Sequence, residues 1–375
     1  MRNASWESYA LVGCVTMRAS ILCLSVPLAI TSGVLGRPAS RQPAEKCETP
    51  LIRREWCVSV DGKQDFISAV KCLQSRPGNT SDTFSGVKSR YDDFLALHIT
   101  KTDYVHWVGH FLPWHRYYLW KFEQALRKEC SYGGSLPYWG WAQDSDNETS
   151  ILKSPIFHPD TGFGGNGPYI EDVSYFPEEW QTGIDIPGRS GGGCIADGPF
   201  AGSNISMGPG NHTEYNPHCL RRDMSPWLMT QSLNKSTVEF ILNSTDYFEL
   251  DHRIEGLELG LSGISIHVGG HLGIGGKIGE MSNTYSSPAD PIFWLHHCAI
   301  DRLWDTWQRK DWQKRKVDIG GPDTQWAYPY DYYGELPYEN VTLDFVMNFG
   351  KVAPEVKIRE VMDIHDAPFC IAYTS

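Results

Sequence analysis

The chain has 375 residues, of which 41% are hydrophobic and 21% are charged. This length and balance are typical of a globular protein with a sizeable core, arranged in one or two domains. The net charge of −12 argues against nucleic-acid binding, because that function needs a basic surface.

Residues 1–36 are predicted to be a signal peptide. Arg18 precedes an apolar run from Ile21 to Ile30, and small residues continue to Gly36. A charged start, an apolar middle and a small-residue exit are the marks of a secretory signal, and Met17 offers an alternative start. The apolar run is too short to cross a bilayer, and no other run is longer. We therefore expect a secreted protein without a membrane anchor, whose mature domain spans 37–375.

Two further features agree with secretion. Beyond residue 36, acceptor sequons for N-glycosylation occur at seven asparagines: Asn79, Asn147, Asn204, Asn211, Asn234, Asn243 and Asn340. An even number of cysteines follows the signal segment: Cys47, Cys57, Cys72, Cys130, Cys194, Cys219, Cys298 and Cys370. In an oxidising compartment such a set predicts disulfides, and the spacing lacks a zinc-ribbon pattern. The pairing cannot be read from the sequence.

The spacing of apolar residues predicts a mostly helical chain. Helices are expected over 65–73, over 89–98, over 114–129 behind Pro113, over 236–242, before His271, and from Asp290-Pro291 to about Lys310. Residues 132–222 are rich in Gly, Pro, Asn and Ser, which predicts a long loop-dominated excursion. Residues 320–340 are expected to be coil with short strands. The tail over 352–373 is expected to form a strand pair.

Two histidine clusters lie on either side of the loop-rich stretch. The first holds His98, His106 and His115, and the second holds His267, His271 and the adjacent pair His296 and His297. Three imidazoles are a common way to bind one transition metal. His267 and His271 share one helical face, whereas only one of two adjacent helical residues can face the same point. The two clusters predict a paired metal site, and hence a single domain that brings both together.

A fourth imidazole, that of His110, lies inside the first histidine segment. Pro113 precludes a continuous helix through this stretch. We therefore predict that His110 does not bind a metal.

Two longer motifs point to a known family. The stretches Phe111-Leu-Pro-Trp-His115-Arg116 and Asp290-Pro-Ile-Phe-Trp-Leu-His-His297-Cys-Ala-Ile-Asp301-Arg-Leu-Trp resemble the copper signatures of type-3 copper proteins, which are tyrosinases, catechol oxidases and hemocyanins. The resemblance covers most of residues 47–375. Tyr138-Trp139, the stretch from Asn216 to Asp223, and His267-Val-Gly-Gly-His271 are similar to the short secreted fungal members.

The resemblance implies a mainly α fold. A single domain would have a four-helix-bundle core around a dinuclear metal site, with long loops and a few short strands. Two copper ions would be held by His98, His106 and His115, and by His267, His271 and His297. His296 would then support the ligands without binding metal.

The resemblance also implies roles for residues around the ligands. Phe111 and Phe293 would pack against ligand rings, and Asp301 and Arg302 would hold the last helix. A glutamate that positions a water near the second copper would be Glu255 or Glu258, and the Ile-Glu-Gly setting favours Glu255.

The chain departs from the family pattern at three places, and the departure at Val268 bears on the expected activity by favouring oxidation of diphenols over hydroxylation of monophenols. Many members carry a cysteine two residues before the second histidine, joined to it through sulfur, but Tyr104 stands there. Members that hydroxylate monophenols often carry asparagine after the first histidine of the second triad. Val268 occupies that place and cannot help to deprotonate a phenol. The chain ends soon after the core, so we expect no C-terminal shielding domain of the kind found in longer fungal tyrosinases.

These observations lead to one expected function and two alternatives. We expect an oxidase that converts o-diphenols or o-aminophenols to o-quinones with dioxygen, acting on a small aromatic substrate of fungal secondary metabolism. Six histidines would also bind zinc, so a zinc-dependent, non-redox enzyme of the cyclopenase type acting on an alkaloid is the first alternative. A dioxygen carrier is the second, disfavoured because the chain lacks repeated units. The oligomeric state is left open.

Overall fold

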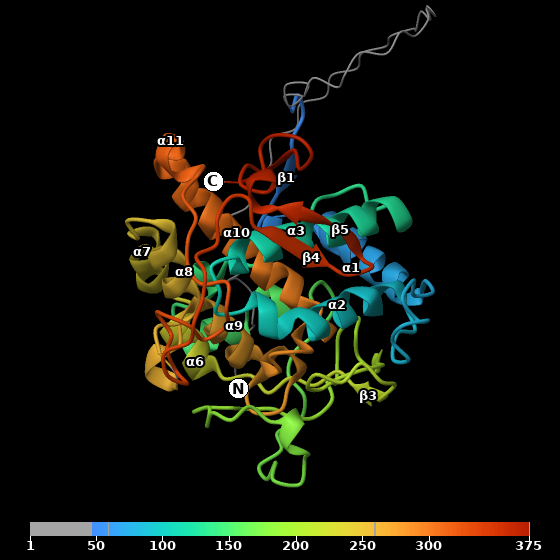
Figure 1. Ribbon diagram of the computed structural model, residues 1–375. Helices are drawn as coiled ribbons and strands as arrows, with labels where there is room; N and C mark the ends of the chain where they lie inside the picture. Colours follow the sequence, from blue (N-terminus) through green and yellow to red (C-terminus); the bar gives the residue numbers. More distant parts are fainter. Residues whose placement is uncertain (1–46, 59, 259, 375) are drawn as a thin grey trace, which may run out of the picture. The chain divides into compact units, whose positions relative to one another are not determined.

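The computed structural model describes residues 47–374 except 59 and 259, so the predicted signal segment lies outside the described residues. This part of the chain is mainly helical, which confirms the expected fold class (Figure 1). The helices are α1 (Val60–Ser75), α2 (Arg90–Val105), α3 (Phe111–Glu129), α4 (Trp141–Asp144), α5 (Glu148–Leu152), α6 (Pro226–Ser232), α7 (Lys235–Leu242), α8 (Tyr247–Glu255), α9 (Ile266–Gly275), α10 (Ile292–Lys310) and α11 (Trp312–Arg315). Among the described residues, no helix combines the length and apolar character needed to cross a bilayer.

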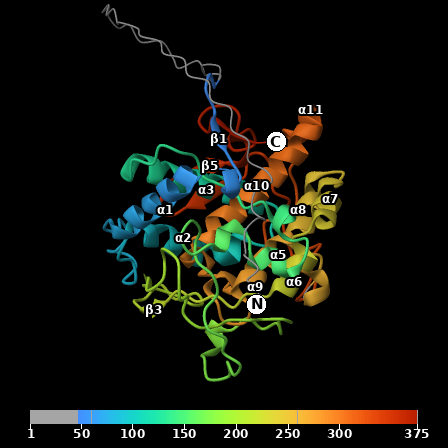
Figure 2. The same cartoon turned by 180° about the vertical axis from the view of Figure 1, so that it is seen from behind.

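Four helices form the centre of this unit: α2, α3, α9 and α10. Helix α10 packs against α3 and α9, and α2 packs against α3, as both views show (Figures 1 and 2). The Phe122 ring of α3 stacks flat on the Trp294 ring of α10 with centroids 3.6 Å apart. The Trp294 indole also donates a hydrogen bond to the Tyr91 hydroxyl of α2. Large buried aromatic side chains therefore fix the relative positions of three of these helices.

Helix α2 is longer than the sequence pattern predicts. It continues to Val105, so the predicted end at His98 is wrong and His98 lies in the middle of the helix. The stretch after His98 is polar, but the Thr102 hydroxyl donates to the His98 carbonyl within the helix. At the start, the Ser89 side chain accepts from the Asp92 amide, and the Asp92 carboxylate accepts from the Ser89 amide. This reciprocal cap stabilises the first turn.

The helices that carry the two motifs begin close to their predicted starts. Helix α3 begins at Phe111, which places Pro113 in the first turn, where a missing N–H leaves no hydrogen bond unmade. Helix α10 begins at Ile292, and the Asp290 carboxylate accepts a hydrogen bond from the Ile292 amide. Both predictions of helix existence are confirmed, with starts displaced by a few residues.

The strands are short: β1 (Leu51–Arg53), β2 (Asn204–Ile205), β3 (His218–Cys219), β4 (Val346–Phe349), β5 (Ala353–Lys357) and β6 (Ile371–Tyr373). They form three two-stranded sheets, β1–β6 parallel and β2–β3 and β4–β5 antiparallel. The predicted strand pair within 352–373 is wrong, because β5 pairs with β4 and β6 pairs with β1. The disulfide between Cys47 and Cys370 places β6 beside β1 rather than beside β5.

Residues 132–222 contain only short helices and the two-residue strands, which confirms the prediction of a loop-dominated excursion. Figure 1 shows its green loops on one side of the central helices. Six of the eight cysteines among the described residues form disulfides: Cys47–Cys370, Cys72–Cys130 and Cys194–Cys219. Cys298 is a buried residue of α10, and burial raises the pKa of its thiol to about 12. Cys298 is therefore a neutral core residue, outside the histidine sites.

A buried cluster of charged side chains connects α10 to other parts of the fold. The Asp301 carboxylate accepts from the Arg53 guanidinium at 3.2 Å, from the Arg116 guanidinium at 2.5 Å and from the Tyr373 hydroxyl. Arg53 also pairs with Glu123 of α3 at 2.7 Å. Asp301 therefore joins α10 to α3, β1 and β6, in agreement with the structural role expected for it.

Candidate metal centre

Three histidines form the first cluster, here called trio A: His98 of α2, His106 directly after α2, and His115 of α3. All three are buried, and the nitrogens available for a metal lie within 4.8 Å of one another. Each ring has its Nδ1 within 3.0 Å of a backbone carbonyl, of Tyr285, Thr102 and Phe111 respectively. The Nε2 atoms of His98 and His115 are buried without a partner. Rings held through one nitrogen, with the other facing a common centre, are arranged as metal ligands are.

The second cluster, trio B, comprises His267 and His271 of α9 and His297 of α10. Its nitrogens also lie within 4.8 Å of one another. The His271 Nδ1 is 2.8 Å from the Met281 carbonyl, and its Nε2 is 3.0 Å from the His297 Nε2. Both ring nitrogens of His267 are buried without a hydrogen-bond partner. Unpaired buried nitrogens are costly, and a bound cation would satisfy them.

The two trios face each other across the centre of the helices. The His115 and His297 rings are stacked with centroids 4.6 Å apart, and the His106 and His267 rings are stacked at 5.8 Å. Histidines from distant parts of the chain therefore converge as two neighbouring groups of three.

Two phenylalanines each touch both trios. The Phe111 centroid lies 4.5 Å from that of His115 and 4.6 Å from that of His267. The Phe293 centroid lies 4.2 Å from that of His297 and 5.3 Å from that of His98. Both phenylalanines are fully buried, and their positions agree with the expected packing role.

All six rings are electrically neutral near pH 7. Burial lowers the pKa of His98 to about 3 and the pKa of His106 to about 4. Burial, with repulsion from neighbouring imidazoles, holds the pKa values of the other four rings well below the ordinary value of 6.5. Neutral imidazoles have free lone pairs, which metal binding requires.

His296 supports trio B from outside. Its Nδ1 accepts a hydrogen bond from the Trp141 indole at 3.1 Å, so its Nε2 carries the proton and donates to the His267 carbonyl at 3.0 Å. Both ring nitrogens of His296 therefore have hydrogen-bond partners. The choice of His297 rather than His296 as a metal ligand stays a prediction, and these two hydrogen bonds favour it.

His110 lies outside both trios. Its Nε2 is 2.7 Å from the Tyr104 carbonyl, and its ring packs 4.5 Å from Phe345. We expect His110→Ala to retain two metal ions per chain, measured by elemental analysis, while lost packing and hydrogen bonding reduce the free energy of unfolding by roughly 1–3 kcal/mol. Loss of one ion per chain would contradict this assignment.

Glu255 ends α8 and is fully buried, whereas Glu258 is exposed. The Glu255 Oε1 accepts from the Trp107 amide at 2.7 Å, and its Oε2 accepts from the Tyr330 hydroxyl at 3.1 Å. Burial, and then repulsion from the buried Asp251 carboxylate, raises the pKa of Glu255 well above its ordinary value. The structure thus places Glu255 beside the residue that follows His106, and leaves Glu258 in solvent.

A cavity of about 370 Å³ opens onto both trios. Its histidines are His106 of trio A with His267 and His271 of trio B. Several of its other residues, including Thr182, Ile184 and Trp326, are not predictable from the sequence, because they come from loops. No spacing in those loops indicates which residues approach the histidines.

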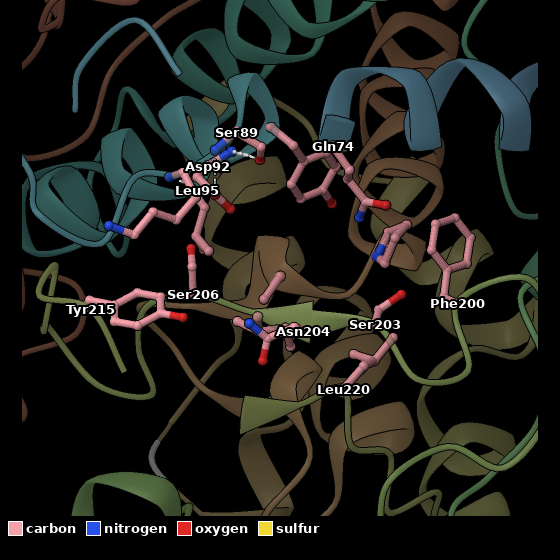
Figure 3. A pocket seen from close by; sticks show the side chains of 15 residues that line it. Gln74, Ser89, Asp92, Leu95, Phe200, Ser203, Asn204, Ser206, Tyr215 and Leu220 are labelled. Atoms are coloured by element: carbon pink, nitrogen blue, oxygen red, sulfur yellow. Dashed lines mark hydrogen bonds between the residues drawn. The ribbon is translucent and has the colours of Figure 1, made fainter. Parts of the chain in front are cut away.

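A second cavity of about 280 Å³ lies where the start of α2 faces β2. Figure 3 shows Ser206 and Asn204 below Asp92, with the Ser206 hydroxyl pointing toward Asp92. No histidine lines this cavity. The arrangement suited to redox or Lewis-acid chemistry is therefore the histidine-lined cavity.

Known proteins are similar to this chain over the part that carries the two trios. The family described as the common central domain of tyrosinase matches residues 88–310, which include all six trio histidines. Tyrosinase P of Aspergillus terreus is 36% identical over 350 residues, covering 88% of this chain and 94% of that protein. N-acetyl-6-hydroxytryptophan oxidase of Emericella nidulans is 36% identical over 351 residues, covering 87% and 93%. The solved structure of a polyphenol oxidase variant from Thermothelomyces thermophila superposes with a TM-score of 0.75 at 33% identity, covering 87% of this chain and 89% of that chain.

Proposed function

Because the chain belongs to the tyrosinase family, we propose that it is a dinuclear copper oxidase that converts o-diphenols or o-aminophenols to o-quinones with dioxygen. The observation that carries this proposal is the convergence of two neutral histidine trios at one cavity. The family implies a dinuclear copper site. Imidazole is a good ligand for copper, and zinc fits the same donor set, so the identity of the metal is part of the proposal.

We propose His98, His106 and His115 as the ligands of one ion and His267, His271 and His297 as the ligands of the other. The buried and unpaired nitrogens of His98, His115 and His267 support this assignment. When bound, the copper pair supplies the electron transfer between the phenolic ring and dioxygen.

The chain itself orients the ligand rings. Backbone carbonyls fix the rotation of four ligand rings through Nδ1, and the buried Phe111 and Phe293 pack against rings of both trios. Neutral ligands add no negative charge, so a pair of bound cations keeps its affinity for electrons.

We further propose that Glu255 positions a water near the second metal site. Its contact with the amide of Trp107, which lines the same cavity as His267 and His271 of trio B, supports this role. The carboxyl group is itself fixed in place, because its two oxygens accept from the Trp107 amide and from the Tyr330 hydroxyl.

Val268 favours oxidation of diphenols over hydroxylation of monophenols. It lines the cavity immediately after His267, and its side chain can neither accept a proton nor hold a water. The names of the relatives, a tyrosinase and an oxidase of a hydroxylated tryptophan, support an aromatic hydroxyl compound as substrate and a role in fungal secondary metabolism. The three disulfides support secretion.

Elemental analysis combined with oxygen uptake tests the proposal. We expect two copper ions per chain and stoichiometric oxygen consumption with a simple catechol, followed by the absorption of the o-quinone. Two zinc ions with no oxygen uptake would instead support the non-redox alternative. Reversible oxygen binding without turnover would support a carrier.

A further inference from the structure

Two histidine rings, one from each trio, are oriented by the same short stretch of backbone, residues 281–285. The His98 Nδ1 lies 2.7 Å from the Tyr285 carbonyl, and the His271 Nδ1 lies 2.8 Å from the Met281 carbonyl. A carbonyl oxygen only accepts hydrogen bonds, so in both rings Nδ1 carries the proton and donates. The lone pair of each neutral ring is then left on Nε2, where it can bind a metal. This stretch therefore sets the tautomer and the direction of one ring in each trio.

The other four rings do not depend on this stretch. The His106 Nδ1 is 3.0 Å from the Thr102 carbonyl of α2, and the His115 Nδ1 is 2.9 Å from the Phe111 carbonyl of α3. Each of these carbonyls lies only four residues earlier in the chain. The remaining two rings of trio B have an Nδ1 without a hydrogen-bond partner. The rings held by residues 281–285 are thus the ones directed by backbone outside the ligand-bearing helices.

Asn283 lies between the two carbonyls and closes a turn there. Its Oδ1 accepts hydrogen bonds from the Tyr285 amide at 3.2 Å and from the Ser286 amide at 3.1 Å. An asparagine oxygen that accepts from backbone amides just ahead of it stabilises such a turn. The Ser286 amide and the Tyr285 carbonyl belong to one planar peptide unit, so fixing the amide also fixes the direction of the carbonyl.

The same side chain connects this stretch to the loop-dominated excursion over 132–222. The Asn283 Oδ1 also accepts from the Gly210 amide at 3.1 Å, and its Nδ2 donates to the Glu179 carbonyl at 2.9 Å. These partners lie 73 and 104 residues earlier in the chain. Two loops of the excursion therefore brace the backbone that orients the two rings.

We propose that Asn283 is a positioning residue that acts on both metal sites at once, through the backbone of residues 281–285. Its four hydrogen bonds all go to backbone groups, so its effect passes through the Met281 and Tyr285 carbonyls. This inference rests on the ligand assignment proposed above. It requires that one substitution outside the trios weakens the hold on both ions.

Metal retention measures this effect without relying on catalysis. The metal-loaded protein is incubated with increasing concentrations of EDTA, and the ions left per chain are counted by elemental analysis. We expect Asn283→Ala to lose both ions at about tenfold lower EDTA than the parent protein, the lower end of the loss that follows removal of a residue supporting a ligand. If Asn283→Ala holds both ions as firmly as the parent protein, or releases only one of them early, the proposal is wrong.

Asn166→Ala is the matched control. Asn166 also holds loops together, because its Oδ1 accepts from the Met224 amide and its Nδ2 donates to the Ser190 hydroxyl. Neither partner belongs to residues 281–285. We expect both variants to unfold at lower denaturant than the parent protein, but only Asn283→Ala to release its ions early. Equal release by the two variants would trace the effect to lost stability and overturn the proposal.

A conservative substitution tests the role of the amide oxygen. Asn283→Asp keeps an oxygen for the Tyr285 and Ser286 amides and loses only the donor to the Glu179 carbonyl. Its metal retention should therefore lie closer to that of the parent protein than to that of Asn283→Ala. Release as early as from Asn283→Ala would contradict the role given to Oδ1.

A milder substitution keeps the test open if Asn283→Ala does not fold. A serine hydroxyl stabilises the same kind of turn more weakly than asparagine. Asn283→Ser is then compared with Asn166→Ser. Earlier release of both ions from Asn283→Ser supports the proposal, and equal release overturns it.

Oxygen uptake with a simple catechol distinguishes failure of this role from failure of the oxidase function. If Asn283→Ala releases both ions early but the parent protein oxidises no catechol, the positioning role stands and the oxidase function fails. If the parent protein oxidises catechol and Asn283→Ala retains both ions as the parent does, the positioning role fails and the oxidase function stands.

Discussion

His271→Ala is expected to lower the bound metal from two ions to one per chain and to reduce quinone formation by more than about 100-fold, the upper range for the loss of a residue that only supports a ligand. His271 is the ring of trio B whose Nε2 lies 3.0 Å from the Nε2 of His297. Without it, only His267 and His297 are left in trio B. Two imidazoles are too few to hold an ion that normally has three protein ligands and an open position.

Elemental analysis and oxygen uptake measured on the same preparation check this result. His212→Ala is the matched control, because His212 lies in an exposed turn outside both trios. The control should keep both ions and full activity. A His271→Ala protein that retains two ions would show that trio B is not the second metal site.

Asp301→Ala is expected to lower the free energy of unfolding by about 3–5 kcal/mol, the usual cost of removing one partner from a buried ion pair. Asp301 lies between the guanidinium groups of Arg53 and Arg116, both almost fully buried. Removing the carboxylate leaves two buried cations with fewer partners. Glu123 can still pair with Arg53, but Arg116 loses its only carboxylate among the described ion pairs.

Denaturant unfolding followed by tryptophan fluorescence measures this loss. Asp82→Ala is the control, because the pair of Asp82 with Lys351 is exposed on both sides and is expected to contribute no measurable stability. If the denaturant midpoint of Asp301→Ala equals that of the parent protein, water replaces the carboxylate. The charge cluster then does not stabilise the position of α10.

The main helices and the histidine trios were predictable because their signals are local. Residues four apart on a helix share a face, so the pairing of His267 and His271 follows from their spacing. The choice between His296 and His297 does not follow from spacing alone. The difference between them comes from Trp141, a residue far away in the chain, whose indole donates a hydrogen bond to the Nδ1 of His296.

The walls of the cavity could not be predicted, because they depend on long-range packing. Thr182 and Ile184 come from the loop-rich excursion, and Trp326 comes from a coil region. The end of α2 was missed for a related reason. The polar stretch after His98 lacks an apolar stripe, and its helix is stabilised by the buried Thr102 and by tertiary contacts.

The covalent link between Cys47 and Cys370 also has a mechanical consequence. It closes a loop of sequence separation 323 that contains all six trio histidines. If the two ends of the chain were pulled apart, the tension would pass through the sulfur–sulfur bond and bypass everything between the two cysteines. Among the described strands, β6 lies beyond Cys370 and would be pulled from β1, whereas the helices around the two trios would carry no load.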